Sequence, residues 1–188
     1  MKKGILLCYH GTREIKGVND TKKLTKIFKK KNYKYLVRTG YLEITKPSIE
    51  KQLNFFLKRK IVDINVIPAM IFSGGHVLKD IPEIIKKFKN KNKSIKITIR
   101  KSLLNKKNFL SLIKTNLSEF IYNKKKDFLI VVASNTISTI AKTQIKQIKS
   151  NLTRHFKFKN SAFFLIGSDS NSLKQKIINL NKQTHCCN

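Results

Sequence analysis

The chain has 188 residues, an apolar share of 40% and a formal net charge of +31, which is enough for one well-buried core and marginal for two full domains. No apolar run approaches the roughly 20 residues of a transmembrane helix, and the N-terminal apolar stretch is short and lacks the small-residue cleavage site of a signal peptide. The chain has only three cysteines, which is not the pattern of a disulfide-bonded protein. We therefore expect a cytoplasmic protein with no membrane partner.

The large basic excess raises the question of nucleic-acid binding. Only five of the 41 basic residues are Arg, although Arg is the residue that reads bases and phosphates with a planar fork. The lysines are spread through every segment and occur with abundant Asn, Ile and Phe, the residues that A- and T-rich codons encode. Base composition is the simpler explanation of the charge, so nucleic acid is not the expected partner.

Strand and helix patterns alternate along the first two thirds of the chain. Asp80 is expected to be the N-cap of a helix rather than a catalytic group, and Pro47 to occupy an early position of another helix. The order of elements predicts an α/β fold with a doubly wound parallel sheet. Strands are predicted at residues 4–9, 35–42, 64–72 and 94–99, and helices at 18–30, from 45–50 onward, at 81–88 and at 106–122. The helix at 18–30 is predicted to carry Leu24, Ile27 and Phe28 on one apolar stripe.

A second unit follows a lysine-rich segment at residues 123–126, which is interpreted as a hinge. The chain therefore divides into a first unit, residues 1–122, and a second, residues 127–188. The second unit opens like the first, with a strand and loop at 127–135, but Ala133 or Ser134 stands where the first unit has His10. A helix at 137–154, a strand at 161–167 and a helix at 173–180 complete it. We expect an incomplete repeat without a metal-site histidine, which covers one side of the first unit's site.

Two histidines follow predicted strands of the first unit. His10 comes directly after the strand at 4–9, and His76 follows the strand at 64–72 and a Gly-Gly pair. Glu43 ends the strand at 35–42. In an open parallel sheet, ligands bind outside the carboxyl ends of the strands, and imidazole is both a common metal ligand and a proton carrier near neutral pH. These three residues therefore predict a metal-binding catalytic site.

The residues around them resemble a known family. The resemblance rests on four ordered motifs that cover about the first 120 residues, and it is to the class II sirohydrochlorin chelatases of the CbiX and SirB type. These motifs are Tyr-His-Gly-Thr-Arg at 9–13, Gly-Tyr-Leu-Glu at 40–43 with Pro-Ser-Ile at 47–49, Val-Ile-Pro at 66–68, and Ser-Gly-Gly-His-Val-Leu-Lys-Asp-Ile-Pro at 73–82. The resemblance implies a chelatase-like fold and ATP-independent insertion of Co²⁺ or Fe²⁺ into sirohydrochlorin, in cobalamin or siroheme biosynthesis.

The motif match also implies the roles of individual residues. His10 and His76 correspond to the family's metal-binding, catalytic histidines, and Glu43 to its nearby acidic residue. Imidazole and carboxylate together suit a first-row divalent ion, and the same groups could accept the two pyrrole protons that metallation expels. No cofactor is expected beyond the metal ion that the enzyme inserts.

Four further residues are candidates for substrate binding. Gly74 and Gly75 would permit the close approach of a flat ligand, or a backbone turn that other residues cannot make. The substrate bears many carboxylates, so Arg13 and Lys79, which lie next to the two histidines in sequence, are candidate anchors.

The resemblance leaves the assembly open, because family members either pair two single-unit chains or fuse two complete units. The partial second unit could close the site, the first units could pair as a homodimer, or the chain could be a decaying protein that keeps its N-terminal chemistry. Two other functions also stay open: a tetrapyrrole- or metal-binding protein without turnover, and a basic nucleic-acid-binding protein. The choice between Co²⁺ and Fe²⁺ and the role of the C-terminal His185-Cys186-Cys187 segment are not determined by sequence.

Overall fold

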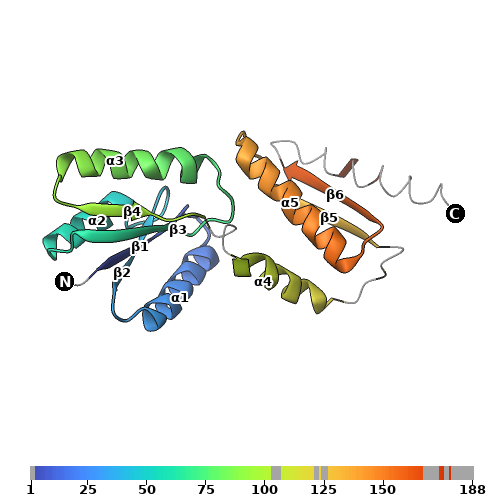
Figure 1. Cartoon of the computed structure of the whole chain (residues 1–188), viewed down its shortest axis with the longest axis horizontal. Coiled ribbons are helices and arrows are strands. Elements are labelled where there is room, and N and C mark those ends of the chain that lie inside the picture. Colours follow the sequence, from blue (N-terminus) through green and yellow to red (C-terminus); the bar gives the residue numbers. More distant parts are fainter. Residues whose placement is uncertain are drawn as a thin grey trace. The chain divides into compact units, whose positions relative to one another are not determined.

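The computed structural model describes residues 3–102, 107–120, 123, 127–166, 174–175 and 178. The contacts divide the chain into two compact units, Met1–Phe109 and Leu110–Asn188, and each is considered by itself (Figure 1). The predicted hinge at 123–126 lies, apart from Asn123, outside the described residues. Within the described part of the chain, no helix has the length and apolar character needed to cross a bilayer.

A four-stranded parallel sheet forms the centre of the first unit. Its order is β2-β1-β3-β4, and every neighbouring pair is parallel. The strands are β1 (Gly4–Tyr9), β2 (Leu36–Tyr41), β3 (Asp63–Pro68) and β4 (Lys96–Ile99), and the helices are α1 (Ile15–Lys31), α2 (Ile49–Lys58), a short wide turn η1 (His76–Asp80) and α3 (Ile81–Lys91).

Helices cover both faces of this sheet. Side chains of β1 point alternately to one face and to the other, and each set packs against different helices. Leu6 and Cys8 point into a core built with α2 and α3, whose buried side chains include Phe56 and Ile81. The intervening residues, such as Leu7, face the other way and pack with Val37 and with Phe28 of α1. Figure 1 shows α1 and α3 on opposite sides of the sheet. The predicted doubly wound parallel sheet is therefore confirmed for this unit.

The pairing register places the carboxyl ends of β1, β2 and β3 side by side. Along β1, Tyr9 pairs with Tyr41 of β2, and Cys8 pairs with Pro68 of β3. The loops that follow β1, β2 and β3 therefore start side by side at the carboxyl edge of the sheet, where the candidate site residues lie.

Helix α1 buries a different stripe from the predicted one. Phe28 packs on the sheet, but Leu24 and Ile27 are exposed. The face of α1 that meets β2 carries threonines instead, because Thr25 bonds Thr39 through their hydroxyls at 2.8 Å, and Thr21 bonds the Tyr41 hydroxyl at 2.8 Å. The prediction that Leu24 and Ile27 share a buried stripe with Phe28 was wrong.

Two boundaries also differ from the predictions. Strand β3 ends at Pro68, four residues before the predicted end at 72, and a loop continues to Gly75. Pro47 lies outside α2, because Ser48 is the N-cap and its hydroxyl accepts a hydrogen bond of 3.3 Å from the Lys51 amide. Pro47 therefore precedes the helix instead of occupying its first turn.

The second unit contains a parallel pair of strands and a long helix. Strands β5 (Phe128–Ser134) and β6 (Asn160–Ile166) pair in parallel, and α5 (Thr139–Phe156) connects them. The buried face of α5 includes Ile145, Ile148 and Leu152. Helix α4 (Lys107–Ser118) precedes β5 across the division between the units. These elements agree with the prediction, and the helix predicted at 173–180 lies mostly outside the described residues.

Candidate metal centre

His10 is the first residue after β1, and backbone hydrogen bonds bring the loop after β2 alongside it. The Leu42 amide donates to the Tyr9 carbonyl and the Glu43 amide donates to the His10 carbonyl, each at 2.9 Å. The ring of His10 donates from Nδ1 to the Gly11 carbonyl at 3.1 Å. Its Nε2 is then the nitrogen available to a ligand, and it lies 3.9 Å from a carboxylate oxygen of Glu43.

Gly11 permits this close approach of the two loops. Its φ is +103°, a conformation that L side chains rarely adopt, and a Cβ on this residue would collide with the carbonyl oxygen of Glu43. A second connection lies just beyond it. The Thr12 amide donates to the Thr45 hydroxyl, which donates in turn to the Thr12 carbonyl, both at 2.9 Å. These two hydrogen bonds join the loops after β1 and β2 at Thr45, two residues beyond Glu43.

His76 begins the wide turn η1, in which the amides of Val77 and Leu78 both donate to the Gly74 carbonyl, at 3.1 and 3.0 Å. The Nδ1 of His76 donates to the Asp80 carboxylate at 2.6 Å. The prediction that Asp80 caps a helix was wrong: its backbone is helical, its side chain makes no capping bond, and the helical path already starts at His76. The carboxylate holds the His76 ring instead.

The structure brings His10, Glu43 and His76 into one cluster. One ligand atom from each residue lies within 4.8 Å of the others. The two imidazole rings are 4.6 Å apart between centroids and meet at 68°, edge to face. In the described part of the chain, no other group of three or more His, Cys, Asp or Glu side chains meets this spacing. Two imidazoles and a carboxylate form a partial ligand set for a first-row divalent ion.

The cluster is open to solvent, since the side chains of His10, Glu43 and His76 are 46%, 51% and 37% exposed. Structural metal sites are closed by four protein ligands, whereas sites that exchange a ligand keep a position free. Three exposed ligands at a sheet edge suit an ion that must enter and leave.

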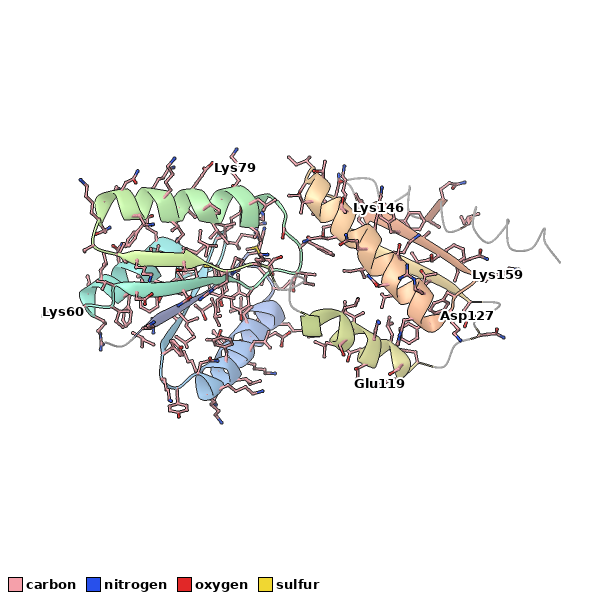
Figure 2. The ribbon with its side chains drawn as sticks, in the orientation of Figure 1. Lys60, Lys79, Glu119, Asp127, Lys146 and Lys159 are labelled. Atoms are coloured by element: carbon pink, nitrogen blue, oxygen red, sulfur yellow. The ribbon has the colours of Figure 1, made fainter. Side chains whose placement is uncertain are left out.

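The remaining predicted site residues do not join the cluster. Arg13 and Lys79 are exposed, and Figure 2 shows Lys79 of η1 projecting outward, next to the start of α3. A Cβ on Gly74 or Gly75 would meet nothing within 4 Å, and neither has a positive φ. The interpretation that these glycines make a turn forbidden to other residues was therefore wrong, while open space lies beside them.

Sequence reasoning missed the residues that support the ligands. The Thr12–Thr45 pair joins two loops that are far apart in sequence, so no local pattern marks it. Ser73 and Ser102 form a buried hydrogen bond of 2.9 Å between the segments after β3 and β4. The i,i+4 spacing of His76 and Asp80 was a usable signal, because residues at this spacing are neighbours on a helix.

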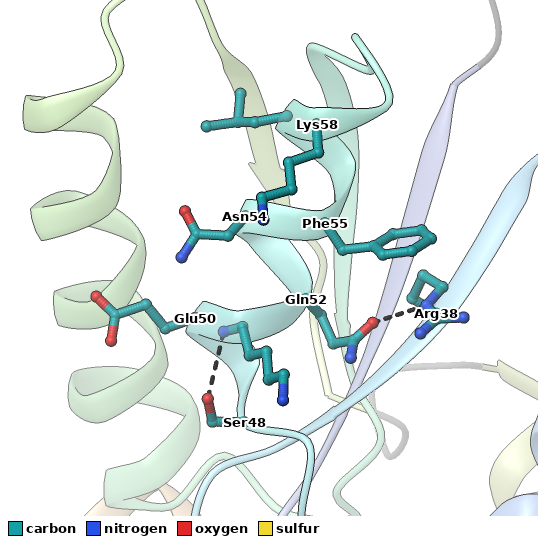
Figure 3. A pocket seen from close by; sticks show the side chains of 9 residues that line it. Arg38, Ser48, Glu50, Gln52, Asn54, Phe55 and Lys58 are labelled. Atoms are coloured by element: carbon teal, nitrogen blue, oxygen red, sulfur yellow. Dashed lines mark hydrogen bonds between the residues drawn. The ribbon is translucent and has the colours of Figure 1, made fainter.

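Two hollows of the first unit lie beside β2, one against α2 and the other against α1, and no residue of the metal cluster lines either of them. The hollow against α2, of about 690 Å³, is lined mainly by polar and charged residues together with Phe55 and Leu57, and Figure 3 shows Arg38 donating to Gln52 within it. That bond is 2.7 Å, and the guanidinium lies 4.2 Å from the centre of the Phe55 ring. These contacts explain how Arg38 is held at an edge strand.

The fold and the site define an open, parallel α/β protein with a histidine and carboxylate cluster at the carboxyl edge of its sheet. The CbiX family model matches residues 4–120, more than half of the sequence, and the chain belongs to the CbiX family. The predicted family and the predicted chelatase-like fold are thus confirmed.

Individual proteins agree with this assignment. The chain is 32% identical over 85 residues to a sirohydrochlorin cobaltochelatase of Methanococcoides burtonii, across 45% of this chain and 65% of that relative. It thus spans slightly less than two thirds of that relative's length. SirB from Bacillus subtilis with Fe³⁺ has a TM-score of 0.80 at 18% identity, over 94% of this chain and 71% of that one. SirB from Bacillus subtilis subspecies spizizenii in complex with cobalt has a TM-score of 0.78 at 17% identity, over 97% and 84%. These two likenesses show the fold.

Proposed function

We propose that this protein inserts Co²⁺ or Fe²⁺ into sirohydrochlorin without ATP, as a metal chelatase of cobalamin or siroheme biosynthesis. The observation that carries the proposal is the convergence of His10, Glu43 and His76, with ligand atoms within 4.8 Å, in a member of the CbiX family. A relative named sirohydrochlorin cobaltochelatase supports the choice of substrate.

The metal ion enters as a substrate held by the two imidazoles and the carboxylate. Because Nδ1 of each histidine already donates a hydrogen bond, Nε2 is the nitrogen that binds the ion on both rings. The open geometry lets the pyrrole nitrogens approach the ion and replace the protein ligands one by one. A partial ligand set of this kind binds the ion without retaining it.

The proton balance of the reaction matches this ligand set. A divalent ion replaces two pyrrole N–H protons, so two protons must leave as the ion enters the macrocycle. Each protein ligand that the ion leaves regains a lone pair and can take a proton. We assign this role to His10 and Glu43, which are 3.9 Å apart and reach solvent for the subsequent release.

Substrate binding would use charge and open space around the cluster. The net charge of +31 attracts a polycarboxylate such as sirohydrochlorin, and Arg13 and Lys79 flank the two histidines in sequence. The empty space beside Gly74 and Gly75 would admit the edge of a flat ring. These contacts position the macrocycle while the metal ligands carry out the exchange.

One active site per chain is the arrangement that this ligand set favours, because all three ligands come from the first unit. Ala133 and Ser134, at the end of β5, offer no imidazole. We propose that the second unit does not repeat the metal site of the first. The buried free thiol of Cys8 is consistent with a reducing, cytoplasmic setting.

The test is conversion of sirohydrochlorin by the purified chain with Co²⁺ and, anaerobically, with Fe²⁺, followed by absorbance against a protein-free reaction. Metal-dependent product formation above the uncatalysed rate is expected. Binding of metal and sirohydrochlorin without conversion would instead identify a carrier protein. Salt-sensitive binding to nucleic acid, well above that of other lysine-rich proteins and without conversion, would favour the nucleic-acid alternative.

A further inference from the structure

We infer that Asp80 is a positioning residue that holds the His76 ring in the tautomer whose Nε2 is free to bind the metal ion. The observation is the hydrogen bond of 2.6 Å between His76 Nδ1 and the Asp80 carboxylate, across one turn of η1. The inference deepens the proposed function and rests on it, because it takes His76 to be a metal ligand.

The chemistry of the pair determines which nitrogen carries the proton. A neutral imidazole has one N–H donor and one acceptor nitrogen, and an ionised carboxylate only accepts hydrogen bonds. With Asp80 on Nδ1, the hydrogen is placed there and the lone pair is on Nε2. A carboxylate in this position also fixes the plane of the ring and makes the imidazole a better electron donor to a metal.

The backbone around the pair shows that this contact is built into the fold. Gly74 accepts hydrogen bonds from two successive amides, Val77 and Leu78, so the helical path starts at His76 and widens before α3. A single wide turn inside a helix occurs frequently at functional sites. In this turn the His76 and Asp80 side chains are on the same side and meet.

The two histidines are held by different partners. His10 donates to the main-chain carbonyl of its own neighbour, Gly11, at 3.1 Å, whereas His76 donates to a carboxylate at the shorter distance of 2.6 Å. Charge-assisted hydrogen bonds are shorter and stronger than neutral ones. We therefore infer that His76 is the more firmly placed ligand, and that a change at Asp80 affects His76 and not His10.

The experiment compares Asp80→Ala with Glu83→Ala in the metal-free protein. Glu83 is an exposed acid in the first turn of α3, three residues after Asp80, so the control removes the same charge from a nearby position. Long-range ¹H–¹⁵N NMR reads the tautomer of each imidazole at a pH where the rings are neutral. The chain has four histidines, and His76→Ala assigns the signal. We expect Nδ1-protonated His76 in the wild type and in Glu83→Ala, and a shift toward Nε2 protonation in Asp80→Ala.

Titration with Co²⁺, followed by its visible absorption, supplies a second readout. Loss of a carboxylate behind a metal-binding histidine weakens metal affinity by about 10- to 100-fold, so Asp80→Ala should fall in this range and Glu83→Ala should not. Asp80→Asn keeps an oxygen acceptor without the charge and should be intermediate, and it decides the question if Asp80→Ala does not fold. An unchanged His76 tautomer in Asp80→Ala, or wild-type affinity for Co²⁺ in both Asp80 variants, would overturn the inference.

These readouts separate the inference from the proposed function. The tautomer and the Co²⁺ affinity are measured without sirohydrochlorin, so they do not depend on turnover. If the wild type fails to metallate sirohydrochlorin but the Asp80 variants change as expected, the proposed function is wrong and the positioning role stands. If turnover occurs but the Asp80 variants leave the tautomer and the Co²⁺ affinity unchanged, the proposed function stands and the positioning role is wrong.

Discussion

His10 and His76 meet edge to face, 4.6 Å apart between ring centroids. They follow strands β1 and β3, which are separated in sequence by α1, β2 and α2. Their proximity follows from the strand order. Strands β1 and β3 are direct neighbours in the sheet, with Cys8 opposite Pro68, so the loops that follow them leave the same edge. The β1–β2 pairing brings Glu43 to the same place.

Gly11→Ala should weaken both the fold and the metal site. The added methyl group meets the Glu43 carbonyl, and the φ of +103° is strained for alanine, so we expect a loss of about 1–3 kcal/mol in unfolding free energy. Urea unfolding and Co²⁺ titration measure the two effects. Gly75→Ala is the matched control, because its φ of −52° suits alanine and its surroundings are empty. Equal stability of the two variants would contradict this account of Gly11.

Thr45→Val should disturb the position of Glu43 without touching a metal ligand. The substitution removes the hydroxyl that both donates to and accepts from Thr12, and leaving such backbone groups unpaired costs about 1–3 kcal/mol. We expect lower stability together with weaker Co²⁺ binding. Thr45→Ser keeps the hydroxyl and should restore both properties; if serine behaves like valine, the reciprocal pair is not what orders the loop.

Alkaline pH should destabilise the protein partly through Cys8. Burial raises the pKa of this thiol above its ordinary value of 9.0, so the folded state keeps the proton that the unfolded chain releases. This contribution to stability is complete below the unfolded pKa and falls as pH rises through and beyond it, by up to about 1.4 kcal/mol per pH unit. Urea unfolding between pH 7 and 10 should show a shallower decline in Cys8→Ala than in the wild type, and parallel curves would contradict the prediction.

Arg13→Ala and Lys79→Ala should weaken sirohydrochlorin binding while Co²⁺ affinity is unchanged. Exposed charge pairs contribute about 0.2–1 kcal/mol each, which corresponds to an increase in KM of up to about five-fold. The effect should diminish as salt is added, since exposed charges are screened. Lys91→Ala is the control, because Lys91 is the last residue of α3 whereas Lys79 lies in η1, before α3 begins. A response of Lys91→Ala equal to that of Lys79→Ala would point to bulk charge instead of local anchors.

The parts of the structure that sequence predicted are those with a regular physical cause. Short apolar runs marked the parallel strands. Because such strands end at one edge of the sheet, the sequence predicted that His10, Glu43 and His76 lie close together. The parts that sequence missed depend on tertiary hydrogen bonds. An Asp at a helix start is normally a cap, and only the double acceptance by Gly74 reveals that the helical path begins at His76. Likewise, the threonine face of α1 is understood only once Thr39 and Tyr41 are opposite it.

The central claim is that the His10, Glu43 and His76 cluster performs metal insertion, and one comparison of initial rates tests it most directly. Cobalt insertion into sirohydrochlorin is measured for His10→Ala and His76→Ala beside His155→Ala, which changes a histidine of α5 outside the cluster. Loss of a metal ligand, which in His10→Ala is also a proton acceptor, should slow insertion by at least about 100-fold in the first two variants and leave the third at the wild-type rate. Wild-type rates in both His10→Ala and His76→Ala would contradict the claim.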